Sequence, residues 1–388
     1  DIVSTGSITS NDTITLLTKQ LSNTEIYKYL VVIYVDNALA GNSITSASFT
    51  GNISADANQG KVPYAGLAKD IQDLYVNADK TIVTNNSINY EYDTTNNLMQ
   101  DVGGNIRYYG ASPNNYIYFN CSDYANQSSS TCELWRIIGV FDGKVKLVRD
   151  TSIGSYSWDN KDKTTGAENN NGKNDWTDAR LMKLLNPGYD SETVGGSLYY
   201  NAKSGTCYKN ANNATKDCDF TSIGIKNSAT RNLIQEVVYN IGGWNTNAVY
   251  SDFIYEKERG TTVYSGRPTT WTGKIGLMYP SDYGYAADFT KCKDASGNDL
   301  KIGSYNSDVN DYQCRKNNYL YKDAWEWLLT HNSGSSHDVW IVYSTGNVNP
   351  YHAASYISCV RPVVFLSSTQ DIAGGNGSES TPYQLKVS

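Results

Sequence analysis

His331, His337 and His352 are the three histidines of this 388-residue chain, and they fall within a window of 22 residues. Imidazoles gathered in this way could ligate a metal ion or act as general bases. The segment around them is rich in Gly and Ser, so it lacks the fixed spacing that a rigid helix or strand gives to metal ligands. We therefore predict solvated loop histidines, no metal site and no cofactor.

Carboxylates could supply the acid–base pair of a glycosidase, which needs two such groups facing each other across a cleft. Candidates occur in helix-like contexts, where charged residues usually face solvent; they are Glu256, Glu258, Asp323 and Glu326. The Gly-x-Ser-x-Gly motif of a nucleophilic serine does not occur in the sequence. The sequence favours a protein that is not an enzyme, and a hydrolase of cell-wall or host polymers is a third hypothesis.

The segment 333–355 is the best candidate for ligand binding because it mixes aromatic residues with asparagines. Rigid aromatic area and adaptable hydrogen-bonding groups are the combination that binding loops use. We expect Trp340, inside Val-Trp-Ile-Val-Tyr, to belong to the core. The candidate ligand-binding residues are Tyr343, Asn347, Asn349, Tyr351 and His352.

Seven cysteines are present, and their local spacing predicts three disulfides, Cys121–Cys132, Cys207–Cys218 and Cys292–Cys314. Other pairings of these six remain open on spacing alone. Cys359 is left as a free thiol that we expect to be buried in an apolar strand. Zinc is the competing explanation, but no Cys-x-x-Cys pair occurs. Three disulfides imply an oxidising compartment and favour a secreted protein.

The composition combines 32 tyrosines with many neutral polar residues and only 18% charged residues. This mixture favours a β-rich α+β surface protein. A net charge of −7 argues against a nucleic-acid partner, which would require a basic face. No apolar run has the length of a membrane span.

The elements that must position these residues centre on 132–150, which predicts a β-hairpin with a type I′ turn at Asp142-Gly143. A second apolar run, 355–367, predicts a buried strand in the same sheet. Shorter strands are expected at 106–109 and 116–119. Apolar spacing predicts helices over 64–77, 175–185, 228–239, 249–258 and 321–329, and a strand with a turn within 270–286.

Residues 1–58 predict a partial β-sandwich whose strands lack a second sheet. A strand containing Ile2, Val3 and Ile8 could pair with another chain and give a head-to-tail polymer. An upstream part of the same protein could equally complete the sandwich. We predict three segments: this β-module at 1–58, a linker helix and irregular connector at 59–105, and an α+β domain at 106–388.

Two resemblances add to this interpretation. The stretch YLVVIYVDNALAGNSITSASFTGNISADA resembles the last strands of a jelly-roll module in surface and fibre-forming proteins of Gram-positive bacteria, similar to TasA-like subunits. The stretches WRIIGVFDGKVKLVRD, NDWTDARLMKLLNPGY, WTGKIGLMYPSDYGYA and CVRPVVFL resemble an extracellular family of gut Firmicutes with a C-type lectin-like fold. The calcium-ligating motifs of sugar-binding C-type lectins are not in the sequence.

These observations predict a secreted or cell-surface structural protein: a filament subunit that displays an adhesive, lectin-like domain. Its expected partners are copies of itself, bound through the N-terminal β-module. The alternative is a monomeric receptor that binds a glycan, peptide or host protein through 333–355. Uniform filaments or oligomers would favour the first, and a monomer that binds a ligand would favour the second.

Overall fold

The computed structural model describes residues 65–160, 171–209, 213–302, 309–354 and 356–387. The chain divides into two compact units, Asp1–Lys61 and Val62–Ser388. All described residues belong to the second unit. The predicted β-module at 1–58, with Ile2, Val3 and Ile8, therefore lies outside the described residues.

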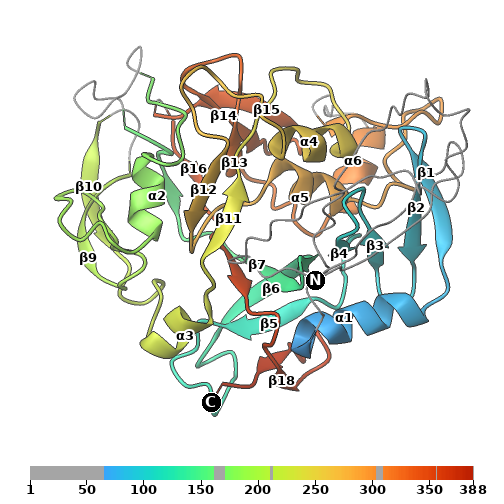
Figure 1. The fold of residues 1–388 in the computed structure, drawn as a ribbon, viewed down its shortest axis with the longest axis horizontal. Coiled ribbons are helices and arrows are strands. Elements are labelled where there is room, and N and C mark those ends of the chain that lie inside the picture. Colours follow the sequence, from blue (N-terminus) through green and yellow to red (C-terminus); the bar gives the residue numbers. More distant parts are fainter. Residues whose placement is uncertain (1–64, 161–170, 210–212, 303–308, 355, 388) are drawn as a thin grey trace, which may run out of the picture. The chain divides into compact units, whose positions relative to one another are not determined.

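The predicted central hairpin is confirmed as strands β6 (Glu133–Phe141) and β7 (Lys144–Arg149). Asp142 and Gly143 connect them with φ values of 48° and 74°, the two positive angles of a type I′ turn. The C-terminal strand β17 (Val363–Leu366) pairs antiparallel with β7. This pairing confirms that the hairpin and the closing strand share one sheet (Figure 1).

Eight strands make up this large sheet, in the order β1-β2-β3-β4-β6-β7-β17, and β5 also pairs with β6. The predicted short strands are confirmed as β4 and β5. Gly139 of β6 lies against β4, where an added Cβ would come within 2.2 Å of the Ile106 carbonyl oxygen. A side chain there would push the two strands apart. The remaining strands are β1 (Thr81–Asn85), β2 (Ile88–Asp93), β3 (Leu98–Gln100), β4 (Ile106–Tyr108) and β5 (Tyr116–Phe119).

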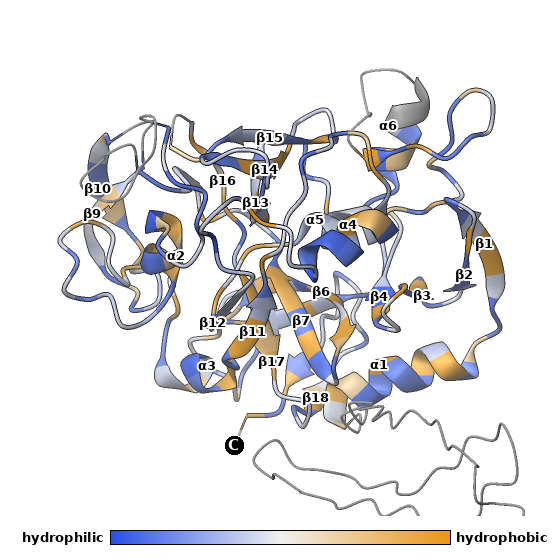
Figure 2. Cartoon of the chain, turned by 45° about the horizontal axis from the view of Figure 1, so that its top comes forward, coloured by the Kyte–Doolittle hydropathy of each residue, from blue (hydrophilic) through white to orange (hydrophobic). Residues whose placement is uncertain are grey.

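Helix α1 (Gly66–Asn77) corresponds to the predicted linker helix, but it packs against the domain. Its buried residues Leu67, Ile71 and Tyr75 join the main hydrophobic core, and its exposed side mixes polar residues with the apolar Val76 (Figure 2). The Leu67 N–H donates to the Gln370 carbonyl over 2.8 Å. With β1–β4 also in the large sheet, the structure of 66–105 differs from the predicted connector and extends the domain toward the N-terminus.

A second sheet has the order β15-β14-β13-β16-β8. Its strand β13 occupies part of 321–329, so the predicted helix there is wrong. All six residues of β13 are buried, including Glu326. An apolar run buried on both faces lacks the alternation that would have identified a strand. The strands are β8 (Ser155–Tyr156), β13 (Glu326–His331), β14 (Asp338–Val342), β15 (Val348–His352) and β16 (Ser358–Cys359).

The expected helices near the middle of the chain are shorter than predicted. Helix α2 begins at Arg180, and α3 ends at Leu233 because Val237–Asn240 pairs as strand β11 with β12. Pairing of the backbone with β12 makes Val237–Asn240 a strand, although the spacing of the apolar residues predicted a helix there. The remaining elements are α2 (Arg180–Leu185), α3 (Ser228–Leu233), α4 (Ser251–Glu258), α5 (Pro280–Tyr285), α6 (Val309–Lys316), β9 (Ser204–Tyr208), β10 (Thr215–Asp219), β11 (Val237–Asn240), β12 (Thr270–Gly273), β18 (Ile372–Gly374) and β19 (Gln384–Leu385).

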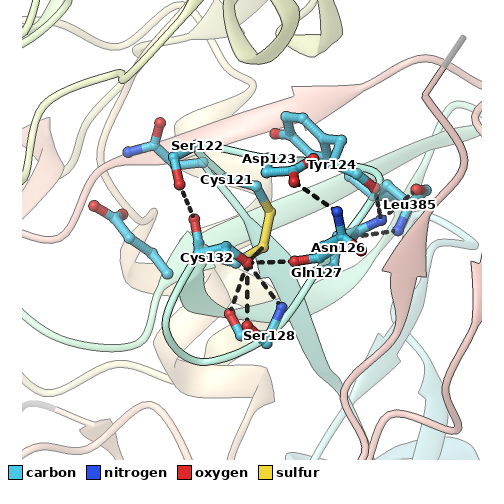
Figure 3. The surroundings of a disulfide bond; sticks show 12 residues. Cys121, Ser122, Asp123, Tyr124, Asn126, Gln127, Ser128, Cys132 and Leu385 are labelled. Carbon is cyan, nitrogen blue, oxygen red and sulfur yellow. Dashed lines mark hydrogen bonds between the residues drawn. A yellow bond between two sulfur atoms is a disulfide. The ribbon is translucent and has the colours of Figure 1, made fainter.

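All three predicted disulfides are present: Cys121–Cys132, Cys207–Cys218 and Cys292–Cys314. Figure 3 shows the first of them closing a polar loop, from which Gln127 donates to the Leu385 carbonyl over 2.7 Å. The disulfide closes the loop, and the hydrogen bonds of Gln127 hold it against the C-terminal strand β19. Cys359 is free as predicted, but it is half-buried on the two-residue strand β16.

One main hydrophobic core joins the two sheets and α1. Trp340 is fully buried in it, as predicted, together with Trp135, Trp158 and Trp327. The fold is thus β-rich α+β. Among the described residues, no helix has the length and apolar character needed to cross a lipid bilayer.

Candidate ligand-binding surface

The segment predicted to bind ligand forms an ordered β-hairpin. Strands β14 and β15 pair antiparallel over five positions, from Asp338↔His352 to Val342↔Val348. At the closed end, the Tyr343 N–H donates to the Asn347 carbonyl over 2.9 Å. At the open end, the Ala353 N–H donates to the His337 carbonyl over 2.8 Å. Side chains on this hairpin therefore occupy fixed positions.

A cluster of contacting, partly exposed aromatic side chains lies beside strands β13, β14 and β15 of the second sheet. The ring of Trp325 lies 4.8 Å from that of Tyr343 and 5.2 Å from that of Tyr351 between centroids. Tyr351 in turn lies 4.2 Å from Tyr356, which is 44% exposed. We call these four residues the aromatic surface. Sequence reasoning identified Tyr343 and Tyr351 and missed Trp325 and Tyr356.

Hydrogen bonds fix the aromatic surface. The Trp325 indole N–H donates to Ser344 Oγ over 3.3 Å, and the Trp325 carbonyl accepts from the Cys359 N–H over 2.8 Å. Burial, together with a hydrogen bond to Tyr356, raises the pKa of Tyr351 to about 12. Burial also raises the pKa of Tyr343. Both phenols are therefore neutral at physiological pH and can donate or accept hydrogen bonds.

The other predicted site residues have different surroundings. Asn347 is 8% exposed and lies in the hairpin turn, where its side-chain oxygen accepts from Thr345. That position gives it a structural role. Asn349 is half-buried and lies opposite Ile341 in the strand pairing. His352 lies beside Tyr351, with ring centroids 6.3 Å apart.

The three histidines differ from the solvated loop residues that the sequence predicts. His331 is 4% exposed on β13, and its Nε2 accepts from the Tyr264 N–H. Burial lowers its pKa to about 4, and the positive charge of Arg267 adds to the effect. His337 and His352 are partly exposed, and their Nε2 atoms lie 3.8 and 3.7 Å from Asp338 Oδ1. These two histidines and Asp338 form a group that could hold a metal ion.

Two of the carboxylates considered for hydrolysis are buried in ion pairs, whereas the sequence predicted solvent-facing charges. Glu326 accepts two hydrogen bonds from Arg361, over 2.7 and 2.8 Å. Glu258 is fully buried and accepts from Ser281 and Arg259. Each carboxylate is held by a cation, and this arrangement stabilises structure without offering an acid–base pair to a substrate.

Two pockets of the described residues are small. The pocket lined by Trp176, Arg267 and His331 leaves no room for a small molecule. The pocket lined by Leu184 and Tyr208 has an internal volume of about 10 Å³. A single water needs about that much space. Neither of these two pockets could hold a ligand larger than a water molecule.

Comparisons of the chain with protein-family models, curated proteins and solved structures find no match. What the structure defines is a β-rich α+β domain with three disulfides, which fit an oxidising compartment. The lectin-like and TasA-like resemblances remain predictions.

Proposed function

We propose that this chain is an extracellular binding protein whose aromatic surface recognises a carbohydrate. The observation that carries the proposal is the group of four contacting, partly exposed aromatic side chains on the second sheet, Trp325, Tyr343, Tyr351 and Tyr356. These residues come from three separate stretches of chain and meet only in the fold. Single aromatic residues scattered over a surface are common, whereas these four contact one another.

The chemistry of a sugar suits this surface. One face of a pyranose ring presents C–H groups, which are attracted to the electron-rich face of an aromatic ring. Its hydroxyl groups need donors and acceptors at the edge of the contact, and the phenols of Tyr351 and Tyr356 supply both. Because the aromatic side chains are already held in contact, binding requires little ordering of them.

Neither of the two pockets could hold a sugar, whereas the aromatic surface is open and suits an extended ligand. A polymer of sugars can lie across an open surface and gain area from several units. The proposal therefore names polysaccharides or long oligosaccharides as the ligand class.

The test is a glycan array probed with the full chain, followed by calorimetry on the best ligand. Trp325→Ala should weaken binding by about tenfold or more, since an aromatic contact contributes on the order of 1.4 kcal/mol. Trp325→Phe keeps a ring and should retain most of the affinity. No binding to any glycan, or equal affinity in Trp325→Ala, would contradict the proposal. Saturable binding to a peptide or protein instead would favour the receptor alternative.

Assembly into filaments is a separate prediction. It depends on Ile2, Val3 and Ile8, which lie outside the described residues. The described domain neither requires nor opposes it, because a carbohydrate-binding surface can be displayed on a monomer or on a filament.

A further inference from the structure

We propose that His337, Asp338 and His352 form a binding site for a first-row divalent metal ion of the zinc type. Their ligand atoms lie within 4.8 Å of one another, and the three side chains are partly exposed, so an ion can enter. The proposal goes beyond carbohydrate binding and rests on different residues from the aromatic surface.

The backbone holds two of the ligands opposite each other. Asp338 begins β14 and His352 ends β15, and the two residues are direct partners in the strand pairing. Directly opposed residues place their side chains on the same face of a sheet. His337 precedes Asp338, and its carbonyl accepts from the Ala353 N–H. The three ligands therefore lie together at the open end of the hairpin, which backbone hydrogen bonds hold.

Asp338 Oδ1 supplies the second observation. This atom is buried and accepts no hydrogen bond among the described residues. It faces the two imidazole Nε2 atoms at 3.7 and 3.8 Å, beyond hydrogen-bonding distance. A buried carboxylate oxygen without a partner is costly. A cation placed between the three atoms would satisfy it.

The distances match a site that closes slightly on binding. Ligand atoms about 2.0–2.1 Å from a tetrahedral zinc ion lie roughly 3.3–3.4 Å apart. The two separations at Asp338 exceed that by a few tenths of an ångström. Small rotations of the two imidazole rings can remove this excess.

The donor set selects the kind of metal. Two imidazoles and one carboxylate suit Zn²⁺, Cu²⁺, Ni²⁺ or Co²⁺, whereas Ca²⁺ and Mg²⁺ require mostly oxygen ligands. Three protein ligands leave one position of a tetrahedral zinc ion for water or another ligand. The site therefore belongs to the class with an open coordination position.

Neighbouring groups position the ligands. Ser336 Oγ lies 3.2 Å from His337 Nδ1, which leaves Nε2 facing Asp338. The Asn174 side-chain amide donates to the Asp338 carbonyl over 2.9 Å and to the Ser335 carbonyl over 2.7 Å. Such outer contacts hold metal ligands in place and raise affinity.

The test is a zinc titration of the full chain in competition with a chromophoric chelator. Wild type should bind zinc at this site, and Asp338→Asn and His337→Gln should each weaken that binding at least about tenfold, since even outer-shell contacts reach this range. The matched control is His331→Gln, which removes the one histidine outside the group and should leave zinc affinity unchanged. Cobalt should give the visible absorption of a four-coordinate ion in wild type and in His331→Gln, but not in Asp338→Asn or His337→Gln.

Zinc should also raise the unfolding temperature of wild type more than that of either variant, because a ligand that binds the native state stabilises it. Thermal unfolding without metal checks that both variants fold. If wild type, Asp338→Asn and His337→Gln bind zinc equally, the proposal is wrong. Trp325→Ala should retain zinc binding and His337→Gln should retain glycan binding, so the two proposals fail separately.

Discussion

Two carboxylates on adjacent strands of the second sheet have opposite surroundings. Glu326 of β13 is 4% exposed and makes two hydrogen bonds with Arg361. Asp338 of β14 has a buried oxygen that faces two histidines without a hydrogen bond. Both carboxylate oxygens of Glu326 are paired within the fold, whereas the β14–β15 hairpin retains polar and aromatic groups that an external ligand can contact. Function is therefore expected at the hairpin.

The same contrast appears in the large sheet. Asp282 is fully buried and accepts from both Arg107 and Lys146, whose charges lower its pKa although burial opposes them. Arg107 and Lys146 come from β4 and β7, so this group ties neighbouring parts of the sheet to α5. Both carboxylate oxygens of Asp282 are therefore paired within the fold, as those of Glu326 are.

The largest expected effect follows from breaking the Glu326 pair. Arg361→Met removes the cation and leaves a buried carboxylate, which should lower the free energy of unfolding by about 3–5 kcal/mol. Urea denaturation measures it. Asp338→Asn in metal-free buffer is the comparison and should change stability by less than about 1 kcal/mol, because Asp338 Oδ1 makes no hydrogen bond that the change would break. Equal losses of unfolding free energy in the two variants would mean that the fold does not depend more on the Glu326 pair than on Asp338.

A second prediction concerns His331, which is neutral in the fold because burial lowers its pKa to about 4. In the unfolded chain it takes up a proton below about pH 6.5. Stability from this residue is therefore present above that pH and falls by about 3 kcal/mol as pH drops to 4.

Asp159 changes stability with pH in the opposite direction, because burial raises its pKa to about 6 in the fold. As the pH falls, the native state takes up this proton before the unfolded chain does, which favours the native state. Comparing wild type with His331→Gln cancels that contribution. The stability difference between the two proteins, from urea denaturation, should shrink by about 3 kcal/mol between pH 7 and pH 4. A difference that stays constant over this range would show that His331 titrates normally.

A third prediction tests how the hairpin is anchored. Asn174→Ala removes an amide that donates to the Ser335 and Asp338 carbonyls, and it should cost about 1–3 kcal/mol of stability. Zinc affinity should fall as well, since Asp338 loses its support. Asn349→Ala, on the same hairpin, is the control and should change stability by less than about 1 kcal/mol. Similar losses in both variants would argue against a special role for Asn174.

Local patterns in the sequence predicted the β6–β7 hairpin, strand β17 and the three disulfides. Turn residues and close cysteine spacing determine these features within a few positions. The error at 321–329 arose because tertiary burial, together with Arg361 some 35 residues away, makes β13 a strand. Trp325 and Tyr356 were missed for a similar reason: they join Tyr351 only across strands. The histidine group depends on the pairing of Asp338 with His352, which residue spacing does not reveal.

The most direct test of the account compares two equally exposed tyrosines. Tyr356 is 44% exposed within the aromatic surface, and Tyr312 is 46% exposed on α6, outside it. With the best glycan from the array, calorimetry should show that Tyr356→Ala weakens binding by about tenfold while Tyr312→Ala leaves it unchanged, with both variants as stable as wild type. If both tyrosines weaken binding equally, or neither does, the aromatic surface is not the binding site.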